Sequence, residues 1–262
     1  GGSNILFTKN YNGTIFHSIN KSVHIVNNVD GECLVRAYAG FEWDDFVSYT
    51  VNNNLIGLEA LSLIPGSVGA APVQNIGAYG TEVSDYIHSV ECYDALTKRT
   101  VVLKQIDCDF SYRHSIFKEK SELFVVSVVF KLYKSERSHY QFLNKTKLST
   151  LDYFKYTKKL IELGMKSFRF GVHTKWRLKM NFENLRGVLG LPVVPSRLKR
   201  KVVVFIRKRN MPNPSVVANV GCFFKSPIVQ KRMLAELDLD PSVAIYEHDE
   251  KSVKVSAGDL IK

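Results

Sequence analysis

Apolar and polar residues alternate in two stretches of the chain, and both stretches predict β-hairpins. Ser22 to Val26 is largely apolar and β-branched, and Glu32 to Ala39 alternates after it. Between them lies Asp30-Gly31, a dipeptide that favours tight turns between antiparallel strands. Ser89 to Leu103 repeats the pattern around Thr97-Lys98. We therefore expect two hairpins in the first half of the chain.

Other stretches have different periods. Phe41 to Asn52 has helical spacing, and the residues expected on its buried face are Phe46, Val47, Thr50 and Val51. Leu123 to Tyr133 is almost continuously apolar, which predicts a central strand buried on both faces. Val253 to Ser256 predicts a short strand, and Ala257 to Leu260 the start of a helix.

Two further segments are helix candidates. Thr150 to Leu163 has apolar residues near i, i+3 and i+4 spacing and is followed by glycine, a common helix end. Ser196 to Arg209 is ambiguous, because three consecutive valines favour a strand. A helix begun by a serine cap is the alternative, and its apolar positions would be Leu198, Val202, Phe205 and Ile206.

The stretch from Leu63 to Gly80 carries almost no charge and is dense in glycine, proline and other small residues. Glycine lets the backbone approach another group closely, and successive N–H groups in such a turn can bind phosphate. We interpret the stretch as a loop wrapped around a flat or anionic molecule; a buried turn between strands is the alternative. It lacks both the Gly-Lys-Ser/Thr ending of NTPase loops and the G-x-G-x-x-G of dinucleotide-binding folds.

Charge is unevenly distributed along this chain of net charge +11. Residues 134–181 hold twelve Lys or Arg and three Asp or Glu, and residues 195–210 hold seven Lys or Arg and no acid. Such segments are usually solvated surfaces. Because residues 134–181 are also rich in aromatics, single-stranded nucleic-acid binding is the alternative, and we regard it as the weaker one.

The four cysteines form no C-x-x-C pair, and the seven histidines are scattered. We therefore expect no metal site, and histidines that are surface or satisfied core residues. A reduced, cytoplasmic protein is the default for this cysteine usage. No apolar run approaches the roughly 18–20 residues that span a bilayer, so we expect no membrane association.

Three motifs follow one another in the order found in one enzyme family. They are the glycine-rich stretch with Glu82, then Tyr112 to Lys118, and finally Gly221 to Pro227. Together they resemble the bacterial UDP-N-acetylenolpyruvoylglucosamine reductases, which make UDP-N-acetylmuramate for peptidoglycan. The resemblance also favours a helix over Ser196 to Arg209, and it makes the chain look incomplete at both ends.

The resemblance implies an α+β fold with two parts. An FAD-binding region of the vanillyl-alcohol-oxidase/PCMH type would cover residues 1–211, with a basic insertion at about 134–181. Part of a small α/β substrate-binding domain would cover residues 212–262. We expect a monomer.

The resemblance also implies FAD as cofactor, NADPH as hydride donor and a UDP-sugar as substrate. The residues it places at the cofactor are Gly1, Gly2, Ser3, Asn4, Pro65, Gly66, Gly69, Asn75, Gly77, Tyr79, Gly80 and Arg207. Those it places at the substrate are Tyr112, Phe182, Lys225 and Ser226.

Two residues are the catalytic candidates. Arg113 would stabilise the charge that develops on the substrate carboxylate, because a guanidinium can grip a carboxylate through two N–H groups. Cys222 stands where the family usually has serine. A thiol, which titrates near 8.5 when unperturbed, would serve as proton donor to the carbon left after hydride transfer; a small buried hydrophobic residue is the alternative reading.

Several positions depart from the family pattern. His114 replaces an acidic or similar residue, Phe182 lacks a tyrosine hydroxyl, and Asn210 replaces a lysine. The glutamate that the family uses near its C-terminus has no counterpart here. A degenerate relative that keeps the fold without turnover is therefore the second hypothesis.

Overall fold

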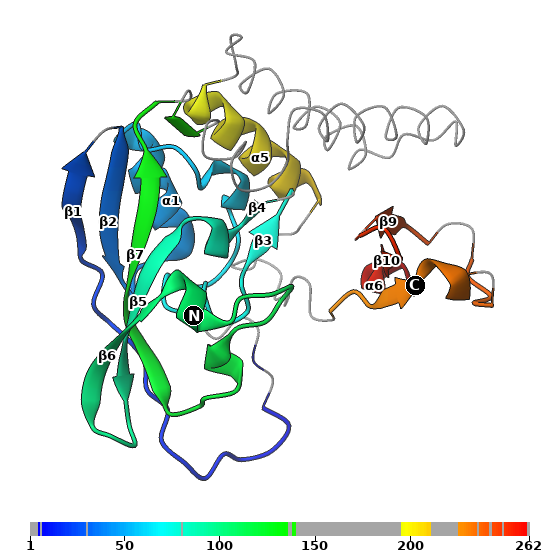
Figure 1. Ribbon diagram of the computed structural model, residues 1–262, viewed down its shortest axis with the longest axis horizontal. Coiled ribbons are helices and arrows are strands. Elements are labelled where there is room, and N and C mark those ends of the chain that lie inside the picture. Colours follow the sequence, from blue (N-terminus) through cyan, green and yellow to red (C-terminus); the bar gives the residue numbers. More distant parts are fainter. Residues whose placement is uncertain are drawn as a thin grey trace. The chain divides into compact units, whose positions relative to one another are not determined.

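The computed structural model describes residues 5, 7–29, 31–79, 81–135, 138–139, 195–210, 225–234, 236–240, 243–247 and 249–260. They fall into two compact units (Figure 1). One unit lies within Tyr11–Asn210, and the other within Met211–Lys262 together with Gly2–Asn10. The assignment of flavin and substrate domains to these parts stays a prediction.

A five-stranded antiparallel sheet forms the first unit, in the order β1-β2-β7-β5-β6 (Figure 1). Its strands are β1 Val23–Val29, β2 Glu32–Tyr38, β5 Ile87–Asp94, β6 Arg99–Lys104 and β7 Leu123–Tyr133. Both predicted hairpins are confirmed, as β1-β2 and β5-β6. Gly31 and Lys98 have positive φ, 81° and 57°, as tight hairpin turns require.

Strand β7 is central, as its continuous apolar run predicted. It pairs with β2 on one side and β5 on the other. Four consecutive residues, Ser127 to Phe130, are buried. Residues at the start of the strand are less buried, and Phe124 is 38% exposed. The half of β7 near Tyr133 is therefore the part buried on both faces.

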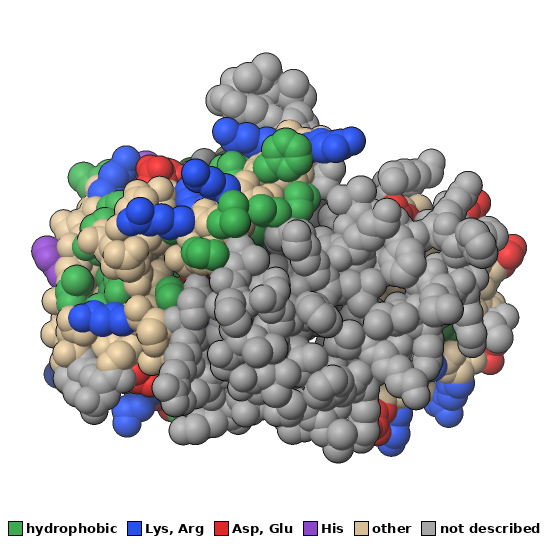
Figure 2. Space-filling view, turned by 90° about the horizontal axis from the view of Figure 1, so that it is seen from above, with side chains coloured by type: hydrophobic (Ala, Val, Ile, Leu, Met, Phe, Trp, Pro, Cys, Tyr) green, Lys and Arg blue, Asp and Glu red, His purple; other side chains and the backbone are tan. Residues whose placement is uncertain are grey.

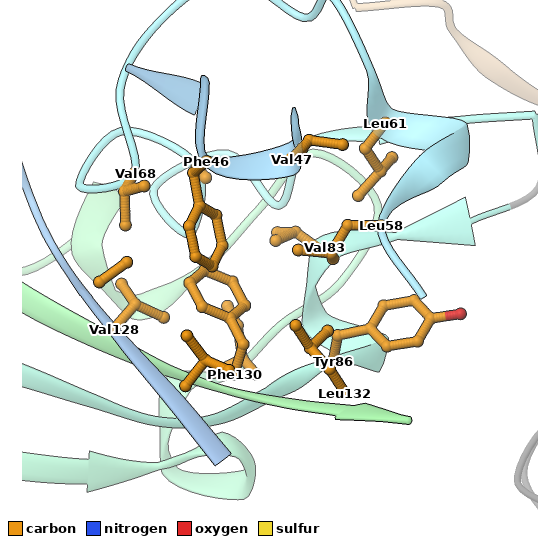
Figure 3. Packing of buried hydrophobic residues seen from close by; sticks show 14 of the residues in the cluster. Phe46, Val47, Leu58, Leu61, Val68, Val83, Tyr86, Val128, Phe130 and Leu132 are labelled. Atoms are coloured by element: carbon orange, nitrogen blue, oxygen red, sulfur yellow. The ribbon is translucent and has the colours of Figure 1, made fainter. Parts of the chain in front are cut away.

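Helix α1 (Trp43–Asn52) packs on one face of this sheet (Figure 1). Its buried residues are Trp43, Phe46, Val47, Thr50 and Val51, so the predicted helix and its buried face are confirmed. Phe46 lies on Phe130 of β7 with ring centroids 4.9 Å apart (Figure 3). Burying one such side chain contributes about 1.5–3 kcal/mol, and this contact fixes α1 against the sheet.

Short elements connect the sheet to the glycine-rich stretch. They are η1 Glu59–Leu61, β3 Gly77–Ala78, β4 Thr81–Glu82, η2 Val83–Asp85, η3 Gln105–Cys108 and η4 Ile116–Lys118. Strands β3 and β4 pair with each other. They carry the end of the glycine-rich stretch and its following glutamate.

Helix α5 (Ser196–Asn210) resolves the ambiguous segment in favour of a helix. Its predicted apolar face was only partly right, because Leu198 is 50% and Phe205 65% exposed. The residues that turn inward are Lys199 and Val203, 7% and 1% exposed. The pattern failed here because basic side chains occupy the buried face. In the described surface of Figure 2, apolar and basic side chains lie next to one another.

The second unit holds a three-stranded sheet in the order β8-β10-β9. Its elements are β8 Ile228–Gln230, η5 Lys231–Met233, β9 Ile245–Glu247, β10 Ser252–Val255 and α6 Ala257–Leu260. The predicted short strand and following helix are thus confirmed within a residue. The predicted helix at Thr150 to Leu163 lies outside the described residues. No helix in the described part of the chain is both long and apolar enough to cross a bilayer.

Candidate functional site

The glycine-rich stretch is tied to the chain between β2 and α1 by backbone hydrogen bonds. Val68 N–H donates to the carbonyl of Phe41 over 2.8 Å, and Gly69 N–H to that of Ala39 over 3.0 Å. A Cβ on Gly69 would lie 2.6 Å from the Cβ of Ala39. Gly69 is therefore required for close packing of the loop on the sheet.

The loop contains a series of residues in the left-handed region: Leu63 (φ 55°), Gly66 (121°), Asn75 (44°) and Tyr79 (54°). Only glycine adopts this region without cost, so Leu63 and Tyr79 are strained. Among the described residues, the only atom within 4 Å of a Cβ added at Gly66 is the Cβ of Ala70, at 3.9 Å. As far as these residues are concerned, a flat molecule can approach the backbone of the loop there.

An ion pair anchors the start of the loop. Arg200 of α5 binds Asp44 of α1 through two N–H groups, at 2.6 and 2.9 Å. The Asp44 carboxylate also accepts the backbone N–H of Leu63 over 2.7 Å. Burial would raise the pKa of Asp44, but the bonds to Arg200 and Leu63 and the arginine charge lower it below its usual value.

Asn75 is the hub of the loop, with none of its surface exposed. Its Nδ2 donates to Glu82 Oε2 over 2.9 Å and to the carbonyl of Ser111 over 3.1 Å. Its Oδ1 accepts the N–H of Ser84 over 3.1 Å. The side chain therefore joins three segments of the protein, while its predicted role at the cofactor stays a prediction.

Arg113 lies at the tip of a tight turn. Ser111 and His114 exchange two backbone hydrogen bonds of 3.2 and 3.1 Å, so Tyr112 and Arg113 are the two turn residues. Arg113 has φ 55°, in the second central position, where type II turns require positive φ and favour glycine. An arginine here costs about 1–2 kcal/mol relative to glycine, which points to a use for its side chain.

The Arg113 guanidinium sits on the end of the glycine-rich loop. Nη1 donates to the carbonyl of Asn75 over 3.1 Å, and Nη2 to that of Gly77 over 2.7 Å. Among the described residues no carboxylate lies within ion-pair distance of it. Lys118 Nζ donates a hydrogen bond to the backbone carbonyl of Arg113 over 3.0 Å. Neutral carbonyls hold the guanidinium, so within the described part of the chain no anion compensates its charge.

Tyr79 and Arg207, two residues predicted at the cofactor, are brought together. The Arg207 guanidinium carbon is 5.5 Å from the centre of the Tyr79 ring, a cation–π distance. Burial raises the pKa of the Tyr79 hydroxyl, and the Arg207 charge partly offsets this. Helix α5 thus places a cation beside the loop.

Two histidines are described in detail, and the expectation of no metal site stays a prediction. His114 Nε2 lies 3.2 Å from Glu119 Oε1 and 3.7 Å from Asp109 Oδ2. These three side chains are close enough together to hold a metal ion, but both acids are mostly exposed, and such exposed groups are common without one. His139 is buried and shares a 2.7 Å hydrogen bond with the Tyr86 hydroxyl.

Three cysteines are described, and all are free and buried. They are Cys33, Cys92 and Cys108. Burial, with minor contributions from neighbouring groups, raises the pKa of both Cys92 and Cys108 to about 12. These thiols therefore stay protonated and behave as apolar core residues.

The remaining predicted residues divide into described and undescribed ones. Pro65 is exposed in the loop, and Tyr112 has its ring 5.5 Å from the Arg113 guanidinium carbon. Lys225 is exposed, and Ser226 Oγ accepts the N–H of Ala257 over 3.2 Å. Outside the described residues lie Gly1, Gly2, Ser3, Asn4, Gly80, Phe182 and Cys222. The expected approach of Arg113 to Cys222 therefore stays a prediction.

The sequence did not reveal the residues that anchor the glycine-rich loop to the rest of the first unit. Asp44 and Arg200 are separated by 156 positions, and nothing local connects them. Ser115 is fully buried and donates to the carbonyl of Val73 over 2.6 Å. Ser115 lies within the Tyr112 to Lys118 motif, but the motif did not assign a role to it.

The sequence of the chain is similar to those of several known proteins. A family model described as "FAD binding domain" matches residues 1–101. UDP-N-acetylenolpyruvoylglucosamine reductases of Neisseria meningitidis serogroup C and Bacteroides fragilis strain YCH46 are 39% and 41% identical to the whole chain. The chain spans 66% and 68% of their lengths. A solved reductase of the same name from Thermus caldophilus, 21% identical, has a TM-score of 0.44 and matches over 73% of this chain and 48% of its own.

The fold is thus α+β and of the FAD-binding, PCMH-type class. The identity over the full length of the chain places it more narrowly. The chain belongs to the UDP-N-acetylenolpyruvoylglucosamine reductase family.

Proposed function

We propose that this chain takes part in the FAD-dependent reduction of UDP-N-acetylglucosamine enolpyruvate to UDP-N-acetylmuramate, with NADPH as the hydride donor. The supporting observation is Arg113, whose guanidinium rests on the carbonyls of Asn75 and Gly77 at the end of the glycine-rich loop. The reaction places the protein in peptidoglycan precursor synthesis. We further propose that it acts in the cytoplasm as a monomer.

The residues present fit a flavin. The loop is half-exposed at Gly66 and Gly77, and of the residues that the structure describes only Ala70 comes within 4 Å of a Cβ added at Gly66. Arg207 brings a cation to Tyr79 on the same loop, which suits a diphosphate. Bound there, FAD would accept a hydride from NADPH and pass a hydride to the enol ether.

Arg113 would bind the carboxylate of the enolpyruvyl group. Hydride addition to the far carbon of the enol double bond puts further negative charge on the carbon that bears the carboxylate and on the carboxylate itself, so the guanidinium holds the transition state more strongly than the substrate. Because Arg113 spends two N–H groups on carbonyls, its remaining N–H groups can be directed at a ligand.

Cys222 would supply the proton that completes the product. A thiol is a stronger acid than the hydroxyl usual at this place in the family. It would donate its proton from Sγ to the carbon next to the carboxylate, and it would regain one from solvent afterwards. This role rests on the Gly221 to Pro227 motif of the sequence.

Two measurements on the purified chain test the proposal. The absorption spectrum should show flavin bands, either as isolated or after addition of FAD. In stopped flow, NADPH should bleach those bands, and the UDP-enolpyruvyl sugar should restore them without oxygen. Bound flavin that the sugar cannot reoxidise would instead support a relative that keeps the fold without turnover.

A further inference from the structure

Glu82 is the acidic residue that follows the glycine-rich loop, at the end of β4. Its carboxylate lies 2.9 Å from Nδ2 of Asn75. It also accepts the backbone N–H of Asp85, whose own carboxylate accepts the N–H of Glu82 over 2.9 Å. This reciprocal pair fixes the Glu82 side chain on η2 before any ligand is bound.

Asn75 connects the fixed carboxylate of Glu82 to the backbone of the glycine-rich loop. Its amide is held by Glu82, Ser84 and Ser111, through three hydrogen bonds of 2.9–3.1 Å. Its backbone has φ 44°, a conformation that asparagine tolerates but that extended alternatives compete with. Without Glu82, one acceptor for the buried Nδ2 is lost, and the restraint on the peptide that follows Asn75 is weaker.

That peptide is where Arg113 is held. The Asn75 carbonyl accepts from Nη1 of Arg113, and the Gly77 carbonyl from Nη2. Glu82 and Arg113 also lie on the same side of Gly77: a Cβ there would be 3.1 Å from Glu82 Cγ and 3.0 Å from Arg113 Nη1. Any rotation of the loop between Asn75 and Gly77 therefore moves the guanidinium.

We propose that Glu82 is a positioning residue for Arg113, acting through the amide of Asn75. This inference rests on the proposed function, in which Arg113 meets the substrate carboxylate. The role is geometric, because no described carboxylate, Glu82 included, is within ion-pair distance of Arg113. A glutamine can accept the hydrogen bond from Asn75 Nδ2 through its amide oxygen, so Glu82→Gln should keep the contact with Asn75 that Glu82→Ala loses.

The test uses the full chain and two readouts. The first is the ¹H–¹⁵N spectrum of arginine side chains without added ligand, in which Arg113→Lys identifies the Arg113 signals. A guanidinium held by two carbonyls gives separate, slowly exchanging NηH signals. We expect Glu82→Ala to average them, and Glu82→Gln and the control Glu32→Ala, an exposed residue of β2, to leave them separate.

The second readout is stopped flow on the two halves of the reaction. Glu82→Ala should slow reoxidation of the flavin by the UDP-enolpyruvyl sugar at least tenfold, since misplacement of about 1 Å costs up to a hundredfold. Reduction by NADPH should stay within about twofold, since Arg113 acts only on the sugar half. Glu82→Gln should recover most of the rate.

Three results would overturn the inference. They are unchanged Arg113 signals in Glu82→Ala, equal slowing of both half-reactions, or a glutamine variant as slow as the alanine one. A wild-type chain that binds flavin but is not reoxidised by the sugar would instead overturn the proposed function. The arginine spectrum would still decide whether Glu82 positions Arg113.

Discussion

Nη2 of Arg113 lies 2.7 Å from the carbonyl oxygen of Gly77. The two residues come from separate motifs, and each has little freedom. Arg113 is in a left-handed turn conformation, and Gly77 has no room for a side chain on the face toward the guanidinium. The pair therefore joins the glycine-rich loop to the arginine turn, and several predictions depend on it.

Gly77→Ala should displace Arg113. The new Cβ would lie 3.0 Å from Arg113 Nη1 and 3.0 Å from the carbonyl of Thr81, so the arginine or the backbone must move. We expect a loss of about 1–3 kcal/mol in the free energy of unfolding and at least roughly tenfold slower flavin reoxidation by the sugar. Denaturant titration and stopped flow measure these. Gly13→Ala is the control and should change neither, because the three described atoms nearest to its added Cβ belong to the far end of the exposed Tyr11 side chain, which can move aside.

Arg113→Gly and Arg113→Ala should differ in stability but not in activity. Both variants lose the guanidinium, so both should lose turnover with the sugar by at least roughly a hundredfold. Glycine relieves the positive φ and alanine does not, so the glycine variant should be more stable by about 1 kcal/mol. Urea titrations of the two variants measure this difference, and equal stabilities would contradict the strain inferred from φ 55°.

Cys222→Ala should separate the two halves of the reaction. The variant loses only the proposed proton donor, so flavin should remain bound and NADPH should still reduce it. Turnover of the UDP-sugar should stop. Cys222→Ser is the matched variant, because serine is the residue usual at this place in the family, and it should keep measurable turnover. Full turnover by the alanine variant would remove Cys222 from the mechanism.

Local sequence patterns predicted the elements of the first unit but not their contacts. The period of two in Glu32 to Ala39 and the helical period in Phe41 to Asn52 depend only on which face is buried, so each could be identified in isolation. That Phe46 would lie on Phe130 depends on packing between distant segments, which no local pattern encodes. The motifs identified Arg113 and the loop as candidate site residues, but the hydrogen bonds between them are known only from the structure.

The backbone of Arg113 and the buried face of α5 both depart from the residue preferences on which sequence-based predictions depend. Arg113 has a positive φ, where a bulky residue is disfavoured, so the motif located it but could not give its backbone conformation. On α5, Lys199 and Arg200 turn inward while Phe205 is exposed. Burial of basic residues depends on a partner such as Asp44, which lies far away in sequence.

Substitutions on α5 should follow the observed burial and not the apolar pattern. Val203 is 1% exposed and Phe205 is 65% exposed. Val203→Ala should therefore reduce the free energy of unfolding by about 2 kcal/mol through lost burial and the cavity left. Phe205→Ala should change it by less than about 0.5 kcal/mol. Thermal or urea unfolding measures both, and a larger loss at Phe205 would show that this side chain packs against another group.

The lowered pKa of Asp44 should make the free energy of unfolding depend on pH. Its pKa is lowered in the folded chain: burial opposes ionisation, but Arg200 and the Leu63 N–H outweigh it. A lowered carboxyl pKa contributes stability above the unfolded value, 3.8, and that contribution is lost as pH falls through the folded value.

Asp44→Asn tests this sign. At pH 7 the variant leaves the partly buried Arg200 without its counter-ion, which should cost about 2 kcal/mol, less than a fully buried pair. Below pH 3.8 the difference from wild type should shrink, because the Asp44 carboxylate is then protonated in the unfolded wild-type chain and, at still lower pH, in the folded one. Urea titrations at several pH values measure the difference. A cost that stays constant between pH 7 and 3 would mean that the ion pair does not stabilise the start of the loop.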